Sequence, residues 1–301
     1  MRVFFPNWVR VPLGVLLLIA NTVLHVLPLL AVALLKALLP WKVLRRTCNL
    51  ALMALAESWI AVNTALILRM TRTRFIVSGE VALHRDGHYL VLANHQSWVD
   101  IPVLQAVFNR RIPLLRFFLK SQLFWVPLLG LAWWALDFPF MKRYSRETLA
   151  HHPELAGRDV EATRRACEKF RDIPVAVTNF VEGTRFTASK HTAQSSPFQH
   201  LLRPRAGGVA FVLTAMGEAL HAILDVTIVY PGVGHGNRPT LLDLFTDRVG
   251  EVRIHVQERP IPEELTRGDY QNDPAFKLSA QAWMNELWTQ KDATATRLLR
   301  E

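Results

Sequence analysis

The chain has 301 residues, half of them hydrophobic, and carries a formal net charge of +10. A basic chain suits an anionic membrane surface or anionic substrates, whereas nucleic acid is disfavoured, because the Lys and Arg residues are dispersed and no nucleic-acid-binding signature is present. The two cysteines, Cys48 and Cys167, have no paired spacing, and no residues have the spacing of metal ligands, so we expect free thiols, no metal site and no other cofactor.

Two hydrophobic stretches near the N-terminus predict helices that associate with a membrane. Val11 to Leu35 contains no charged residue and is long enough to cross a bilayer, whereas Cys48 to Leu68 carries one charge, Glu57. Cations flank the second stretch on both sides: Lys36, Lys42, Arg45 and Arg46 precede it, and Arg69, Arg72 and Arg74 follow it. We predict that residues 1–73 form a hydrophobic helical membrane-association segment that is retained rather than cleaved.

The positions of these cations limit how the two helices can sit in a membrane. If both helices crossed, the four cations between them would lie on the opposite side from the rest of the chain, against the positive-inside tendency. Two arrangements remain: a single span followed by a second helix on the cytoplasmic surface, or a helical pair that enters the cytoplasmic leaflet without crossing. The alternative is that both stretches are core helices of a soluble protein, although such helices seldom run this long without charge.

Residues 74–301 change to short apolar, β-rich runs that alternate with helical segments. This alternation predicts an α/β domain with a mostly parallel sheet of about seven strands flanked by helices. The predicted strands are Phe75–Ser78, Tyr89–Ala93, Pro113–Leu119, Phe138–Met141, Val175–Phe180, Ile223–Tyr230 and Val252–Val256. The predicted helices are Ile101–Phe108, Arg158–Phe170, Gly208–Gly217 and Asp273–Trp288. Leu123–Leu136 is apolar on all faces and predicts a buried core helix, the wall of an apolar groove or a bilayer contact.

The strand Tyr89–Ala93 leads into the run Asn94 to Asp100, at the end of the strand where open α/β sheets bind ligands. On a continuous helix His95 and Asp100 would point about 140° apart, so they meet only if the chain turns between them. The carboxylate would then orient one imidazole nitrogen and leave the other as a general base. The alternative is that Ser97-x-x-Asp100 simply opens a helix and that His95 is an ordinary loop residue.

The strand Val175–Phe180 leads into a second polar run, Glu182-Gly183-Thr184-Arg185. Gly183 allows a tight turn, and the Arg185 guanidinium suits a phosphate, with Thr184 as a hydroxyl donor. Glu182 would orient Arg185 or a substrate hydroxyl. The alternative is a plain surface turn with an exposed Glu–Arg pair. Two further basic segments lie at the end of an apolar run or before a helix: Lys142-Arg143 and Pro204-Arg205-Ala206-Gly207-Gly208.

Together these segments resemble the 1-acylglycerol-3-phosphate acyltransferase family of the glycerolipid acyltransferases. The first family motif, Asn-His-x-x-x-x-Asp, is matched by Asn94, His95 and Asp100, and the third, Phe-Pro-Glu-Gly-Thr-Arg, by residues 180–185 with Val181 in place of Pro. The second motif ends in an Arg after an apolar strand and is matched loosely by Arg143; the fourth, a short apolar strand ending in Pro, is matched by residues 226–231. Residues 202–208 resemble the branch that includes lysocardiolipin-type acyltransferases.

The resemblance implies a direct acyl transfer. His95 removes the proton from the free glycerol hydroxyl of a lysophospholipid, and this hydroxyl attacks the thioester of acyl-CoA or acyl carrier protein. Asp100 orients His95. The acceptor phosphate is held by Glu182, Gly183, Thr184 and Arg185, aided by Arg143. Lysophosphatidic acid giving phosphatidic acid is the expected reaction, and a lysophospholipid with another headgroup is the alternative.

The family resemblance also implies docking to the lipid bilayer through the N-terminal helices, with the catalytic domain on the cytoplasmic side of a cytoplasmic or inner membrane. Two other functions compete with acyl transfer. A non-catalytic lipid-binding protein on the same fold has no use for an oriented base, and a thioesterase needs no phosphate clamp. The sequence has no Gly-x-Ser-x-Gly elbow, no Walker A loop and no complete dinucleotide fingerprint, which disfavours serine hydrolases, P-loop NTPases and dinucleotide enzymes.

Overall fold

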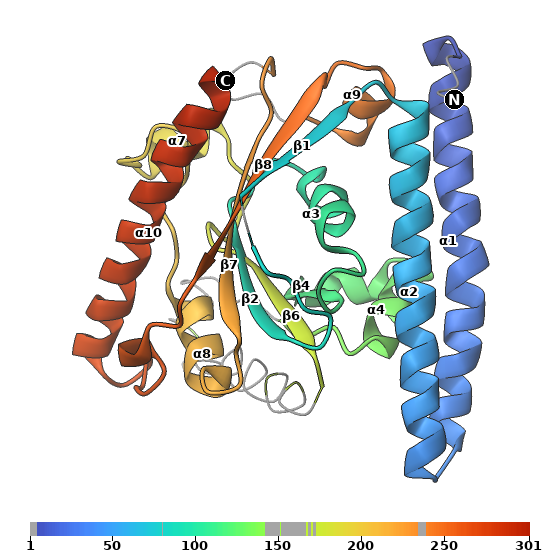
Figure 1. The fold of residues 1–301 in the computed structure, drawn as a ribbon, viewed down its shortest axis with the longest axis horizontal. Coiled ribbons are helices and arrows are strands. Elements are labelled where there is room, and N and C mark those ends of the chain that lie inside the picture. Colours follow the sequence, from blue (N-terminus) through green and yellow to red (C-terminus); the bar gives the residue numbers. More distant parts are fainter. Residues whose placement is uncertain are drawn as a thin grey trace.

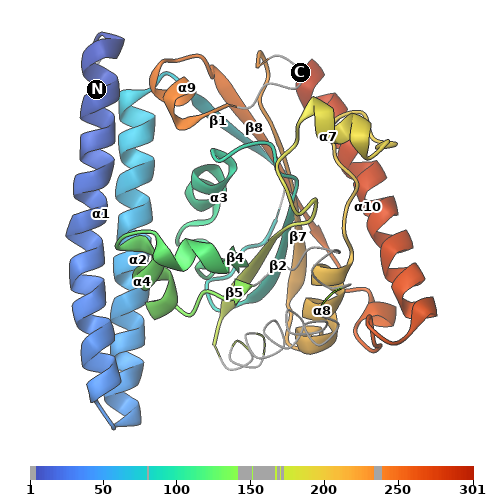
Figure 2. The same cartoon turned by 180° about the vertical axis from the view of Figure 1, so that it is seen from behind.

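A computed structural model describes residues 5–79, 81–141, 173–233 and 239–301, together with His151, Cys167 and Phe170. It begins with two long helices, α1 (Asn7–Leu38) and α2 (Lys42–Met70), which lie side by side as an antiparallel hairpin (Figures 1 and 2). Both are long and apolar enough to cross a membrane. The two helices pack together along their length.

Polar residues inside the hairpin pair with one another across the two helices. Asn21 donates through Nδ2 to Asn63 Oδ1 at 2.8 Å, and His25 Nε2 lies 3.1 Å from Ser58 Oγ. Such contacts satisfy polar groups that would otherwise be buried between apolar helices, so they hold the hairpin in one register. Pro28 is accommodated inside α1.

Ion pairs help to dock the hairpin on the rest of the chain. Glu57, the single acidic residue of α2, is buried and pairs with Arg85 at 2.8 Å. Near the start of α1, the buried Arg10 pairs with Asp247 at 2.6 Å. The hairpin therefore lies against the domain that follows it rather than projecting away from it.

The domain is built on a six-stranded sheet in the order β1-β8-β7-β2-β6-β3. Its strands are β1 (Arg74–Ser78), β2 (His88–Ala93), β3 (Leu115–Phe117), β6 (Val175–Phe180), β7 (Ala222–Val229) and β8 (Glu251–Arg259). Every neighbouring pair is parallel except β7 and β8. The predicted α/β fold with a mostly parallel sheet is confirmed.

One predicted strand belongs to a different sheet. Residues 138–141 contribute β5 (Phe140–Met141), which pairs with β4 (Leu119–Lys120) in a separate two-stranded sheet. The predicted strand 113–119 is correspondingly divided between β3 and β4. The main sheet thus has six strands rather than about seven.

Helices cover both faces of the main sheet (Figures 1 and 2). On one face lie α3 (Asp100–Phe108), α4 (Leu129–Ala135) and the hairpin; on the other lie α8 (Gly207–Met216) and α10 (Pro274–Arg300). The remaining short elements are η1 (Ser121–Trp125), α7 (Ala188–Ala193), α9 (Leu241–Phe245) and η3 (Glu263–Leu265). Asp273 caps α10 through its side chain, as predicted, but the helix continues well beyond Trp288. The predicted helix 158–170 lies almost entirely outside the described residues.

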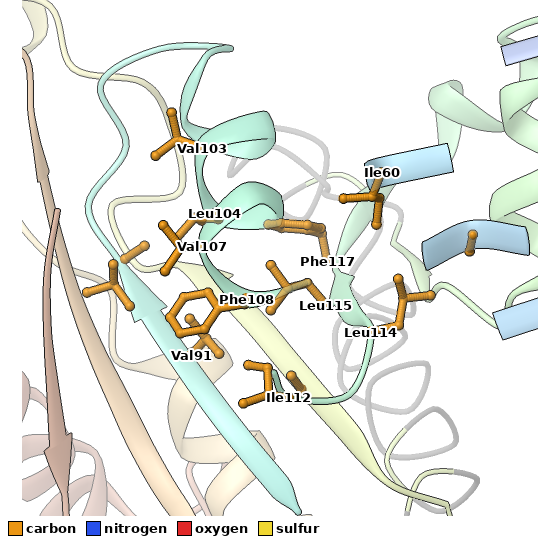
Figure 3. Close-up of a cluster of buried hydrophobic side chains, with 14 of the residues drawn as sticks. Ile60, Val91, Val103, Leu104, Val107, Phe108, Ile112, Leu114, Leu115 and Phe117 are labelled. Carbon is orange, nitrogen blue, oxygen red and sulfur yellow. The ribbon is translucent and has the colours of Figure 1, made fainter. Parts of the chain in front are cut away.

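The central strand β2 has apolar residues on both faces and therefore supplies both cores. Val91 packs with Phe108 and Ile112 in the cluster beneath α3 and α2 (Figure 3), whereas Leu90 and Leu92 belong to the cluster beneath α8 and α10. This alternation follows from the two-residue period of a strand. Complete burial of each such side chain stabilises the fold by about 1.5–3 kcal/mol. Both cysteines, Cys48 and Cys167, are buried.

The apolar segment 123–136 does not form a buried core helix. It is divided between η1 and α4, and Leu128, between the two helices, has φ 63°. Gly130 lies so close to η1 that a Cβ at this position would be 1.8 Å from the carbonyl oxygen of Phe124. The resulting corner leaves Trp125 81% exposed and Trp134 61% exposed. The prediction of a core helix failed here because Pro127 interrupts the run.

Candidate active site

The two polar runs begin at the ends of neighbouring parallel strands. β2 pairs with β6 so that Ala93 lies opposite Phe180, and the polar runs follow directly. On its other side β2 is extended by Asn94, whose buried amide donates to the carbonyl of Ile228 and accepts from the Ile228 N–H, both at 2.9 Å. The side chain of Asn94 thus replaces a rung of the β ladder and fixes where His95 leaves the sheet.

His95 and Asp100 meet because the chain turns between them. The His95 Nδ1 atom lies 2.8 Å from Asp100 Oδ2, and the same oxygen accepts the backbone N–H groups of Gln96 at 2.7 Å and Ser97 at 2.8 Å. Asp100 is the first residue of α3. The helix-opening alternative is therefore also present in the structure: one carboxylate both organises the start of the helix and holds the imidazole.

The second ring nitrogen of His95 is available for chemistry. With Nδ1–H donating to Asp100, Nε2 is the basic nitrogen, and it makes no hydrogen bond within the described part of the chain. The ring stacks on Phe180, with centroids 3.9 Å apart, and the side chain is 14% exposed. His95 is thus held rigidly but reaches solvent, as a general base must.

Sequence reasoning missed Tyr230 as a site residue. This residue follows β7, and its hydroxyl donates to Asp100 Oδ1 at 2.5 Å. Burial, reinforced by the Asp100 charge, raises the pKa of Tyr230 well above its ordinary value, so the phenol stays a neutral donor. The available signal was its position directly before Pro231, at the end of an apolar strand that matches the fourth family motif.

Glu182, which we expected to orient Arg185 or a substrate hydroxyl, lies inside the protein. Its carboxyl is buried and accepts the backbone N–H groups of His95 at 3.4 Å and Leu202 at 3.3 Å. Burial raises the pKa of Glu182 well above its ordinary value. The Phe186 N–H also donates to the carbonyl of His95 at 2.7 Å. Through its bond from the His95 N–H, Glu182 links the polar run after β6 to the polar run after β2.

Arg185 lies beside the histidine loop. Its guanidinium carbon is 4.3 Å from the ring centroid of Trp98, a cation–π contact that holds it over the segment between His95 and Asp100. Gly183 has φ 69°, which glycine adopts without strain. Thr184 Oγ1 is contacted by Lys190 Nζ from α7. Arg143, the remaining predicted ligand, lies outside the described residues.

A buried lysine supports the same edge of the sheet from α10. Lys291 forms an ion pair with Asp225. It also donates to the carbonyls of Val226 in the middle of β7, at 2.7 Å, and of Leu92 near the end of β2, at 3.4 Å. Burial lowers the pKa of Lys291. Arg259 completes the cluster by pairing with Asp225 at 2.9 Å. Among the described residues, no three or more His, Cys, Asp or Glu side chains gather as metal ligands would.

The model of the family described as Acyltransferase matches residues 74–231, more than half of the chain. The chain belongs to the acyltransferase family. This match confirms the resemblance drawn from the motifs.

Several proteins that are similar to this chain in sequence are named as acyltransferases. It is 26% identical to mouse 1-acyl-sn-glycerol-3-phosphate acyltransferase gamma over 68% of this chain and 52% of the mouse protein, so it spans about half the length of that relative. It is 24% identical to Arabidopsis thaliana 1-acyl-sn-glycerol-3-phosphate acyltransferase 3, over 95% of this chain and 73% of the plant protein. Zebrafish (Danio rerio) lysocardiolipin acyltransferase 1 is 24% identical over 81% of this chain and 60% of that protein.

The fold of this acyltransferase also matches a solved structure. The 1-acyl-sn-glycerophosphate (LPA) acyltransferase PlsC from Thermotoga maritima superimposes with a TM-score of 0.54, covering 95% of this chain and 98% of the other. The two sequences are 17% identical, so this likeness concerns the fold.

The contacts of Asp100 predict the effect of Asp100→Asn. The amide oxygen can keep the bonds from His95, Gln96 and Ser97, and the amide nitrogen can donate to Tyr230, so the loop should fold normally. The charge that stabilises a protonated His95 is lost, so turnover should fall on the order of 10⁴-fold. Measuring kcat beside the thermal unfolding midpoint tests this; unchanged turnover would show that the pair is only structural.

The Tyr230 hydrogen bond predicts a pH-dependent loss of stability in Tyr230→Phe. Removing a buried bond to a charged acceptor should cost about 1.5–3 kcal/mol at neutral pH. Because the folded-state pKa is raised, this contribution is complete below the unfolded-state value of about 10 and is lost as pH rises through the folded-state pKa. Chemical denaturation of both proteins at neutral and strongly alkaline pH measures the difference; a gap that is constant with pH would contradict the assignment.

Proposed function

We propose that the protein transfers an acyl group from a thioester, acyl-CoA or acyl carrier protein, to the free glycerol hydroxyl of lysophosphatidic acid, giving phosphatidic acid. The observation that carries this proposal is the juxtaposition of an oriented histidine with an arginine turn. His95 Nε2 is available to accept a proton. Arg185 lies over Trp98, which belongs to the same loop as His95. The names of the relatives support the same reaction class.

The proposed reaction needs no covalent intermediate on the protein. The His95 Nε2 atom takes the proton of the acceptor hydroxyl while the hydroxyl oxygen attacks the thioester carbonyl. Asp100 stabilises the imidazolium that forms, in the role of the triad aspartate. When the tetrahedral intermediate collapses, the C–S bond breaks and the imidazolium returns its proton to the leaving thiolate. The products are the acylated lipid, a free thiol and neutral His95.

Arg185 and Thr184 are proposed to bind the phosphate of the acceptor. A guanidinium binds phosphate through two parallel hydrogen bonds, and the backbone of Gly183 allows close approach. Arg143 is proposed as an additional cation. Glu182 is assigned a positioning role instead, because its buried carboxyl holds the backbone of His95 and Leu202.

An alternative acceptor has support of its own. One relative is named lysocardiolipin acyltransferase 1, and the segment 202–208 resembles that branch. A lysophospholipid with a larger headgroup is therefore the second candidate substrate. The same base and the same first phosphate contact would serve both substrates.

We also propose that residues 1–73 hold the acyltransferase domain, residues 74–301, on the cytoplasmic side of a membrane. The support is the exposed apolar surface of α1, formed by Leu16, Leu24, Leu27, Leu34 and Leu38. Two exposed tryptophans, Trp134 on α4 and Trp125 beside it, add a second apolar surface next to α1. Tryptophan suits the membrane–water interface. Cations between the two helices oppose a double crossing. They leave a single span followed by a helix on the membrane surface, or a pair that enters one leaflet without crossing.

Acyl transfer is tested by incubating purified protein with labelled acyl-CoA, with and without lysophosphatidic acid. We expect labelled phosphatidic acid only when the acceptor is present. His95→Ala should abolish it, whereas Arg185→Ala should raise the acceptor KM about 10- to 100-fold, because a charge-assisted contact is lost. Release of free fatty acid without acceptor would indicate a thioesterase, and lipid binding without turnover a binding protein. Wild-type rates in His95→Ala would exclude His95 as the base.

Membrane insertion predicts that high salt alone will not release the protein from membranes, whereas detergent will. Leu24→Glu on α1 should move protein to the soluble fraction, because a charge then faces lipid. Leu278→Glu on α10 is a matched control, since both leucines are 73% exposed. Equal partitioning of the two variants would argue against insertion through α1.

A further inference from the structure

Basic side chains from three separate segments surround the turn formed by residues 183–185. Arg185 belongs to the turn itself. Lys190 comes from α7, and its Nζ contacts Thr184 Oγ1 and lies 3.2 Å from the carbonyl oxygen of Arg185. Arg205 comes from the loop before α8. The phosphate site proposed above involves Arg185, so the other two cations need an explanation.

Arg205 lies directly against the turn. Its backbone N–H donates to the carbonyl of Val181 at 3.0 Å. Its side chain passes over Gly183: a Cβ at that glycine would be 3.4 Å from Arg205 Cδ and 3.7 Å from Arg205 Cζ. Arg205 is therefore fixed at the backbone while its guanidinium stays beside the point where a ligand would approach the turn.

The guanidinium of Arg205 is not used to hold its own loop. Arg203, two residues earlier, donates to the carbonyls of Gln194 at 2.8 Å and Ser195 at 2.7 Å and so braces the loop. Arg205 is exposed, and its side chain makes no hydrogen bond or ion pair within the described part of the chain. An arginine that is positioned but has no internal partner is available to a ligand.

Glu182, directly before the turn, does not neutralise these cations on the exposed side. The Glu182 carboxyl points into the protein, is fully buried and accepts the N–H groups of His95 and Leu202. Within the described part of the chain, Glu182 therefore does not neutralise the side chains of Arg185, Lys190 and Arg205. A phosphate monoester carries about −1.5 to −2 charges near neutral pH, whereas a phosphodiester carries about −1.

We propose that Arg205 and Lys190 determine headgroup specificity by joining Arg185 in a three-cation site that selects an acceptor with a terminal phosphate monoester. This inference rests on the proposed acyl transfer to a lysophospholipid and narrows its substrate class. Arg205 and Arg185 would contact the phosphate oxygens from two sides, and Lys190 would add a point charge through the Thr184 side of the turn. Capping the phosphate as a diester removes one charge and one acceptor oxygen, so it should weaken binding.

The test compares two acceptors that differ only at the phosphate: lysophosphatidic acid and the same lysolipid with its phosphate converted to a methyl ester. In wild-type full-length protein, kcat/KM should favour the monoester. Arg205→Gln and Lys190→Gln should each raise the KM for the monoester about tenfold, leave kcat nearly unchanged and narrow the preference over the methyl ester. Arg205→Lys should restore part of the preference.

Arg267→Gln serves as the matched control, because it removes the same charge from an arginine that is 86% exposed and paired with Glu218 rather than with the turn. An unchanged KM and preference in Arg205→Gln would overturn the inference, as would a fall in kcat alone.

Equilibrium binding of labelled lysophosphatidic acid in detergent, without an acyl donor, separates the two proposals. Wild-type protein that binds the monoester through Arg205 but transfers no acyl group would overturn the proposed function and not the specificity site. Protein that transfers acyl groups with no loss of affinity in Arg205→Gln would overturn only the site. Protein that neither binds nor transfers would overturn both.

Discussion

The carboxylate of Asp100, fully buried, accepts hydrogen bonds from the His95 ring, from the N–H groups of Gln96 and Ser97 and from the Tyr230 hydroxyl. A buried charge that loses partners is costly, so these contacts constrain one another. The tight turn after β2, the start of α3, the end of β7 and the orientation of the imidazole all depend on this one group. The geometry of the candidate site is therefore a consequence of satisfying a single buried charge.

The parallel sheet makes that arrangement possible. Neighbouring parallel strands end at the same edge, so residues far apart in the chain arrive together there. Three contacts fix this part of the sheet: Asn94 extends the pairing of β2 with β7, Glu182 joins the two polar runs, and Lys291 bonds to the carbonyls of both strands. Hydrogen bonds to the buried polar groups beneath the site thus fix the backbone that carries His95.

The arrangement of the elements also agrees with a lipid substrate. The hairpin and α4 cover the same face of the sheet as α3, whose first residue is Asp100 (Figures 1 and 2). An apolar surface thus lies on the same side of the molecule as the helix that carries part of the site. In the proposed function, the membrane would present the acceptor from this side, while the cationic turn would read its phosphate and the soluble donor would arrive from the cytoplasm.

Local sequence predicted several of the elements and the two central motifs. Alternating apolar runs predicted the strands within one or two residues at β1, β2 and β6, and the argument that His95 and Asp100 meet only across a turn is what the structure contains. Its errors have physical causes. The segment 123–136 was assigned by its apolarity, but a proline divided it. Glu182 was expected to orient Arg185 or a substrate hydroxyl, but its side chain is buried, because successive residues of a turn can point in opposite directions.

The sequence by itself determined the α/β class, the apolar N-terminal helices and the family motifs, because these depend on residue periodicity and on short spacings within one segment. Only the tertiary structure decided that Tyr230 completes the Asp100 network, that Lys190 and Arg205 flank the turn, and that Glu57 docks α2 on the domain through Arg85. Each of these contacts joins segments whose order along the chain says nothing about their separation in space. It is the packing of helices on the two faces of the sheet, driven by apolar burial, that brings them together.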